Sequence, residues 1–273
     1  YTMEQYAAKA KELILKISEN GEIGGYVDSG HTGVPIVYDW LNHLFSREEK
    51  KKLVEFMKTV EQKDFFKGGT NHDPWNSQVA VVRASAITVG LAFYGDGIDD
   101  VAASRLLNTY DTFIQGPAGA LSADNWYAGD DGGMGQGMGY AGYTIPALLE
   151  MQLMWKTANG LSFTQAFGKE NALRYFPQWV GYSYLPYAPP GRGPGEKNWI
   201  VWKTWQFPAR SSAGSHICHF PMLSYVLAEA DPEMASYAKW LMVNRLGEVP
   251  ISSSGGLYYN VGCALKSRFL VWN

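Results

Sequence analysis

The chain has 273 residues, of which 46% are hydrophobic and 18% charged, and its formal net charge is −3. This composition indicates a folded protein rather than a disordered one, and the slight acidic excess argues against a general nucleic-acid binder, which needs basic residues to neutralise phosphates. The length fits one large domain or one and a half ordinary ones. No apolar run approaches the roughly 18 residues of a membrane-spanning helix, so we expect no membrane partner.

Most of the chain shows helical periodicity. Apolar residues recur at steps of three and four, which is typical of helices that bury one face. Ser46 and Ser162 each precede a Glu or Gln by three residues, as in a capping box, and Asp231 before Pro232 marks a third helix start. We predict helices, in chain order, over residues 3–18, 37–45, 46–60, 74–94, 99–114 and 144–157, around Trp179, and over 219–230 and 231–245.

The connections and the tail differ from these helices. Glycine-rich or polar loops are expected at 20–33, 63–71 and 129–143, and a Pro- and Gly-rich loop at 186–215 carries tryptophans at every third residue. A loop of that length is usually functional or flexible. The tail has the pattern of two strands, over 256–261 and 265–272.

This organisation favours a mainly α fold. Antiparallel helices joined in sequence, with long loops on one side, suit an (α/α) toroid of helical hairpins with a cleft at one end. We assign residues 1–250 to this toroid domain, which the chain contains in whole or in part, and residues 251–273 to a β-strand segment. The chain begins with Tyr1 rather than Met, which we interpret as processing or as a cut from a longer protein, and we expect a secreted or periplasmic location.

One loop delivers Asn71 and His72 to the start of the long helix expected from Pro74. Backbone amides and the helix dipole favour an anion there, and the Asn71 amide can donate a hydrogen bond. The same residues could instead be ordinary caps, with Asn71 or Asp73 accepting from first-turn amides. They are therefore candidates for binding a carboxylate.

The stretch from Gly129 to Tyr143 holds seven glycines and two tyrosines. Glycines let a backbone adopt positive φ and approach another body closely. Tyr140 and Tyr143 are three residues apart, so both lie on one face if the helix has already begun. A phenol with its ordinary pKa near 10 is a poor base at neutral pH, and it becomes useful either as a proton donor or where nearby positive charge stabilises the phenolate. The alternative is that both tyrosines simply pack the helix start.

Further polar candidates lie elsewhere in the chain. His216 and His219 have a spacing that could suit a metal, but no third ligand is evident, so we expect none and consider them as acid, base, substrate-positioning or structural residues. Asp130 and Asp131 flank the glycines and could serve a glycosidase or accept bonds as turn residues. Four basic side chains could bind substrate carboxylates, the arginines through two parallel hydrogen bonds and the lysine through its single charge. They are Arg83, Arg192, Lys203 and Arg210.

Taken in order, these segments resemble the heparinase II/III-like polysaccharide lyases. The run Tyr38-Asp39-Trp40-Leu41, with Ser46 to Glu49, is similar to that family's early helix pair. Thr70 to Trp75 is similar to its "N-(N/x)-H-x-x-W" segment, and Asp131 to Tyr140 is similar to its "DG-x-x-x-E-G-P-x-Y" segment. The resemblance covers about residues 25–180.

The resemblance implies a toroid followed by a β-sandwich, and β-elimination at uronic acids in an acidic polysaccharide. This chemistry needs the substrate carboxylate neutralised and a base and an acid beside the reacting carbon and leaving oxygen. By similarity Asn71 binds the carboxylate, together with His72. Tyr140 acts as base, acid or both, with Tyr143 as second choice, and His219 or His216 supplies the partner base or neutralising group. No cofactor is implied. We expect the substrate to be bound also by Trp75, Arg83, Gln136, Trp202 and Arg210.

Two departures from the family pattern are present. Gln136 and Met138 stand where the family often has Glu and Pro, and the net charge of −3 does not favour a polyanion, so a local basic lining would have to overcome it. Two other functions therefore stay open. One is a glycoside hydrolase that uses Asp130 or Asp131, and the other is a glycan-binding protein without catalysis.

Overall fold

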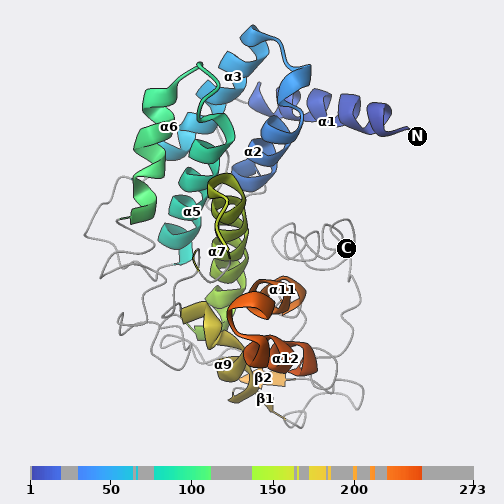
Figure 1. Cartoon of the computed structure of the whole chain (residues 1–273), viewed down its shortest axis with the longest axis vertical. Helices are drawn as coiled ribbons and strands as arrows, with labels where there is room; N and C mark the ends of the chain where they lie inside the picture. The colour runs from blue at the N-terminus through green and yellow to red at the C-terminus, as the bar shows by residue number, and fades with distance from the viewer. Residues whose placement is uncertain are drawn as a thin grey trace.

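The computed structural model of the chain describes residues 2–19, 30–63, 66, 77–111, 137–162, 165, 172–182, 184–185, 199–201, 210–212 and 220–241. Within them the fold is mainly helical, as the sequence predicts (Figure 1). None of the described helices is both long and apolar enough to cross a membrane. The helices are α1 (Met3–Ser18), α2 (Gly30–Trp40), α3 (Arg47–Lys58), α5 (Ser77–Phe93), α6 (Asp100–Leu107), α7 (Gly137–Asn159), α9 (Phe176–Tyr182), α11 (Phe220–Ala230) and α12 (Pro232–Leu241), with 3₁₀ turns η1 (Asn42–Leu44), η2 (Thr59–Gln62) and η5 (Ala172–Arg174).

The predicted helix starts at polar caps are confirmed. The Ser46 hydroxyl accepts from the amide of Glu49 while the Glu49 carboxylate accepts from the amide of Ser46. Ser162 and Gln165 make the same reciprocal pair, and Asp231 accepts from the amide of Met234 at the start of α12. Each cap satisfies amides that the first helical turn leaves without a partner.

The predicted starts of two helices are wrong, because both helices begin inside segments that were predicted to be loops. α2 begins at Gly30 and α7 at Gly137, each seven residues before the expected start. Glycine in a helix costs about 1 kcal/mol relative to alanine. Fully burying a large apolar side chain contributes about 1.5–3 kcal/mol, and both helices bury several, which include Val34, Ile36 and Tyr38 in α2 and Ile145, Leu148 and Leu149 in α7.

Helix α5 lies at the centre of the described helices. Apolar residues at steps of three and four, Val82, Ala86, Val89 and Phe93, are buried on one side of it, and this side packs in one core with residues of α2, α3 and α6. A second side of α5, which includes Ala80, Ala84 and Ile87, packs in another core with α7, α9, α11 and α12. Both sides of α5 are therefore buried, which makes it the element that the two cores share.

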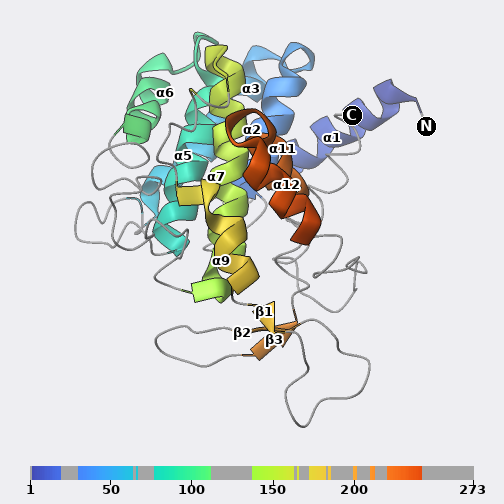
Figure 2. The same ribbon diagram turned by 60° about the horizontal axis from the view of Figure 1, so that its bottom comes forward.

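Neighbouring helices alternate in direction along the chain. The C-terminal ends of α2 and α5 lie together, because the Tyr38 hydroxyl and the Asn42 amide both donate to Asp96, just after α5. The turn from α5 to α6 reverses the chain, and α7 then runs beside α5 in the same direction (Figures 1 and 2). The N-terminal ends of α5 and α7 therefore lie at the same end of the molecule.

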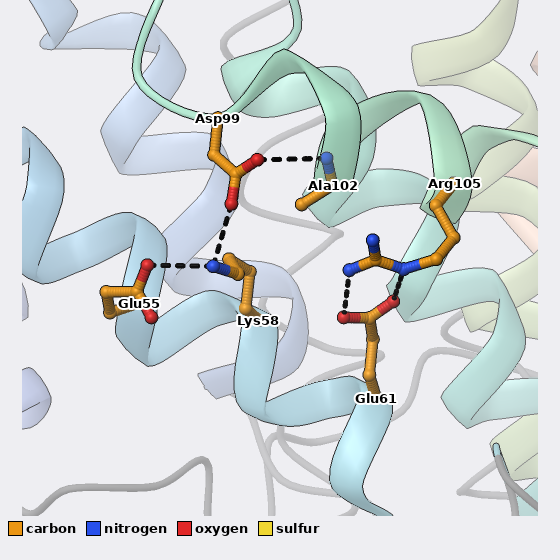
Figure 3. Close-up of polar contacts among 6 residues, drawn as sticks. All are labelled: Glu55, Lys58, Glu61, Asp99, Ala102 and Arg105. Carbon is orange, nitrogen blue, oxygen red and sulfur yellow. Dashed lines mark hydrogen bonds and ion pairs between the residues drawn. The ribbon is translucent and has the colours of Figure 1, made fainter.

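Two sets of charges join α3 and η2 to α6 (Figure 3). Lys58 Nζ lies 2.7 Å from Glu55 Oε1 and 2.8 Å from Asp99 Oδ2. The guanidinium of Arg105 donates two hydrogen bonds of 2.7 Å to the carboxylate of Glu61. Asp99 also accepts from the amide of Ala102, so this one carboxylate caps α6 and pairs with α3. The contacts fix α6 against the preceding hairpin.

Two strands of a small antiparallel sheet lie within the segment expected to be a loop at 186–215, which corrects that prediction, and the third strand lies directly before it. Its strands are β1 (Tyr184–Leu185), β2 (Trp199–Val201) and β3 (Arg210–Ser212), in the order β1-β2-β3. Ile200 faces Tyr184 on one side and Ser211 on the other. Trp, Ile and Val favour strands. The strands predicted at 256–261 and 265–272, and the boundary between 250 and 251, lie outside the described residues.

Candidate active site

Helix α7 carries the two tyrosines that the sequence singles out. Because the helix begins at Gly137, Tyr140 and Tyr143 occupy its first two turns. Their three-residue separation places them about 60° apart around the helix axis, on one side of it. The glycine-rich stretch therefore ends inside a helix, and the condition under which the two phenol-bearing residues share a side is met.

The opposite side of α7 is defined by contacts with the segment after α6. The Tyr110 ring stacks on Trp155 with centroids 3.7 Å apart, and its hydroxyl donates to Gln152 Oε1 at 3.4 Å. Tyr143 precedes Gln152 by nine residues, which is half a turn out of phase at 100° per residue. The tyrosine side of α7 is thus turned away from Tyr110.

The same side of α7 carries a buried acidic residue that the sequence analysis did not identify. Glu150 is 5% exposed and follows Tyr143 by seven residues, two helical turns along the same side. Its neighbours in the run from Ile145 to Met151 are mainly apolar and buried. The sequence did contain a signal for this residue: an acidic side chain within an apolar run, seven residues after Tyr143. Such a residue stands out because buried charges are rare unless they are paired.

Arg83 lies at the middle of α5 and is half-buried. Burial lowers the pKa of its guanidinium. Arg83 precedes Gly90 by two helical turns and so lies on the same side of α5. At Gly90, a Cβ would lie 3.1 Å from atoms of Ala103, Leu106 and Leu107 of α6. Arg83 is also within about 40° of Ile87 around the helix axis, and Ile87 packs in the core shared with α7, so Arg83 lies between the two packed sides of α5.

Other buried polar side chains of α5 are bonded within their own helix. The Ser85 hydroxyl donates to the Val81 carbonyl at 2.7 Å, and the Thr88 hydroxyl donates to the Ala84 carbonyl at 3.1 Å. Such bonds let a hydroxyl be buried without a partner on another helix. We therefore assign these two residues to the packing of α5.

The structure describes only part of the predicted site. Arg210 lies in β3, paired with Val201, and only its backbone is described, as is that of Tyr140 and Tyr143. Among the residues that are described, no three His, Cys, Asp or Glu side chains gather as a possible metal site. The predicted site residues outside the described part are Asn71, His72, Trp75, Asp130, Asp131, Gln136, Arg192, Trp202, Lys203, His216 and His219.

Two of the predicted motifs lead into helices whose N-terminal ends lie at the same end of the molecule, α5 and α7. The chain enters α5 six residues after Asn71, and it enters α7 directly after Gln136. Because the N-terminal ends of these adjacent helices lie together (Figures 1 and 2), the two motifs lead into the same end of the molecule. Comparisons of the chain with protein-family models, curated proteins and solved structures found no match.

Proposed function

We propose that the protein is a polysaccharide lyase that cleaves a uronate-containing glycan by β-elimination. The observation that carries this proposal is the shared end of α5 and α7. The segments that resemble lyase motifs, Asn71–Trp75 and Asp131–Tyr140, precede or open these two adjacent helices. His72 is five residues from Ser77, so it can lie no farther than about 18 Å from the start of α5.

The helix order supports the toroid part of the proposal. Along the chain, α2, α5 and α7 run in one direction, and the intervening α3 and α6 run in the other (Figure 1). α5 packs against both α2 and α7. This alternation is what a double layer of helices requires, with α2, α5 and α7 in the inner layer and α3 and α6 in the outer one. Long connections between the layers would then gather at the end where α5 and α7 begin.

In the proposed reaction, Asn71 and His72 bind the uronate carboxylate and stabilise the charge that develops on it. Tyr140, or Tyr143 in second place, removes the proton on the carbon next to that carboxylate. The electron pair of this C–H bond forms the new carbon–carbon double bond, and the bond to the 4-linked oxygen breaks. A tyrosine or His219 or His216 gives the leaving oxygen its proton, so the products are an unsaturated uronate end and a new sugar hydroxyl.

The direct test is incubation with alginate, heparan, chondroitin, glucuronan and ulvan while the ultraviolet absorbance of the unsaturated product is followed. We expect absorbance to rise with at least one of these polymers. New reducing ends without that absorbance would instead indicate the hydrolase that uses Asp130 or Asp131, and binding with neither signal would indicate a glycan-binding protein.

A matched pair of variants tests the assigned base. Tyr140→Phe should reduce turnover at least 10²-fold, as expected for loss of a general acid or base, while binding of the polymer persists. Tyr6→Phe is the control, because Tyr6 lies on α1 and is 61% exposed. Full turnover by Tyr140→Phe would move the role to Tyr143 or to another group.

A further inference from the structure

Helix α1 carries a row of large apolar side chains that are exposed. The helix packs on α2 and α3 through the side that holds Ile14 and Ser18, both of which are buried, and its N-terminal half extends beyond the other described helices (Figures 1 and 2). The exposed residues are Met3, Tyr6, Leu13 and Ile17, with exposed fractions of 84, 61, 48 and 40%. The row therefore lies largely outside the contacts that hold α1 to the described core.

The exposed row has the spacing of a coiled-coil seam. Together with Ala10, its members follow one another at steps of three, four, three and four residues, so they occupy positions a and d of a heptad. The row is centred about 90° from Ile14 and Ser18 around the helix axis, which makes it separate from the packed side. Contiguous apolar patches on a protein surface mark interaction sites. The heptad spacing indicates that the partner at this patch is another helix.

We propose that the row is a dimerisation surface, on which α1 of a second copy of the chain packs in parallel around a two-fold axis. Isoleucine at an a position with leucine at a d position favours a parallel two-stranded coiled coil, and Ile17 and Leu13 hold these two positions. The two-fold axis runs along the helix pair, so each residue of the row lies beside its own copy.

The residues on either side of the row favour the parallel direction. Lys9 and Lys16, both exposed, line one edge at g positions, and Ala7 and Ile14 line the other edge at e positions. In an antiparallel pair the two lysine edges would face each other, with the two Lys9 side chains near the two-fold axis. In a parallel pair each lysine edge instead faces the apolar edge of the other copy, where the aliphatic stems of the lysines can pack.

The row is short, and small interfaces form transient complexes. We therefore expect a dimer that dissociates on dilution. Dimerisation through α1 does not depend on the proposed lyase activity, because α1 carries none of the predicted site residues.

The test is sedimentation equilibrium of the full chain over a range of concentrations. The apparent mass should rise from 30.3 kDa towards twice that value as the concentration increases. Leu13→Glu should weaken association at least about tenfold, because each dimer would bury two unpaired carboxylates. Ala8→Glu is the matched control, since it adds the same charge at an exposed f position, about 140° from Leu13 around α1, and it should leave association unchanged. A monomer at the highest soluble concentration of the wild type, or an equal loss in both variants, would overturn the inference.

A cysteine cross-link tests the direction of the two helices. In a parallel pair the two copies of Ile17 lie side by side, whereas in an antiparallel pair they lie about 20 Å apart, too far for a disulfide. Ile17→Cys should therefore form a disulfide-linked dimer on mild oxidation, above the level that the wild type forms through Cys218 and Cys263. Ala8→Cys, on the far side of α1, should form no more than the wild type. A dimer that Ile17→Cys does not cross-link, in a variant shown by circular dichroism to be folded, would overturn the parallel arrangement.

Discussion

The hydroxyl of Tyr38 donates a hydrogen bond to Oδ2 of Asp96, which joins the C-terminal end of α2 to the turn after α5. Asn42 donates to the same oxygen at 2.8 Å, and Lys50 Nζ donates to Asn42 Oδ1. The Tyr38 ring is fully buried and stacks near Phe45. This network fixes α2 and α5 in the same direction, on which the proposed inner layer depends.

Tyr38→Phe should therefore destabilise the protein while leaving its fold unchanged. The variant removes one buried hydrogen bond to a charged group, which costs about 1.5–3 kcal/mol. Urea unfolding followed by circular dichroism measures the loss. Tyr6→Phe, at an exposed position, should change stability by less than about 0.5 kcal/mol, and an equal effect of both substitutions would contradict the assigned role of the network.

Stability should also fall at alkaline pH. Burial, with the adjacent Asp96 carboxylate, strongly raises the pKa of Tyr38 in the folded protein. When the pKa of a group is higher in the folded than in the unfolded protein, its contribution to stability is fully present below the unfolded pKa, which is near 10 for tyrosine. This contribution is lost as the pH rises above that value. The wild-type melting temperature should thus fall above about pH 10, and Tyr38→Phe should show a shallower fall. Parallel curves for the two proteins would contradict this attribution.

Asp99 has two roles that two substitutions separate. Asp99→Ala removes both the α6 cap and the ion pair with Lys58 and should cost about 1 kcal/mol. Asp99→Asn keeps a capping oxygen and loses only a partly exposed ion pair, so it should cost less than about 0.5 kcal/mol. Urea unfolding at neutral pH would show the difference, and equal losses would mean that the cap contributes little.

The pH dependence of Asp99 has the opposite sign to that of Tyr38. Lys58, together with the amide of Ala102, lowers the pKa of Asp99 in the folded state. Its contribution is therefore present above the unfolded value near pH 4 and is lost as pH falls through the lower folded value. Because the Asp99 side chain is partly exposed, solvent screens the interaction and the change in melting temperature is small, and Asp99→Asn should reduce it further.

Gly90 marks the closest approach of α5 to α6. A Cβ there would lie 3.1 Å from the Ala103 carbonyl oxygen, Leu106 Cβ and Leu107 Cδ2. Gly90→Ala should therefore destabilise the protein by about 1–3 kcal/mol through overpacking. Gly33→Ala is the matched control, because Gly33 is also helical and has no atom within 4 Å of its added Cβ; it should be neutral or stabilising by up to about 1 kcal/mol. A stable Gly90→Ala variant would contradict the close helix contact.

The sequence predicted what local chemistry determines. The capping pairs at Ser46 and Ser162 were correct because each depends on residues only three positions apart. The starts of α2 and α7 were missed because the burial of distant apolar surface outweighs the poor helix propensity of glycine. The sheet around Ile200 was missed because strand pairing depends on partners far along the chain.

The candidate site could be predicted only in part for the same reason. Helical spacing places Tyr140 and Tyr143 on one side of a helix only if the helix begins before them, and the sequence predicted its start at residue 144, whereas α7 begins at Gly137. The spacing could not show that Tyr143 and Glu150 lie opposite the Tyr110 contact, because that depends on how α6 packs. Nor could it place Arg83 between the two packed sides of α5, because that depends on how α6 and α7 pack against this helix.

The most direct test of the proposed function is the ultraviolet absorbance of the product formed from the five uronate polymers, measured with the wild-type protein and with Tyr140→Phe. The proposal predicts a steady rise in absorbance for the wild type with at least one polymer and its loss in Tyr140→Phe. New reducing ends without any rise in absorbance would contradict β-elimination.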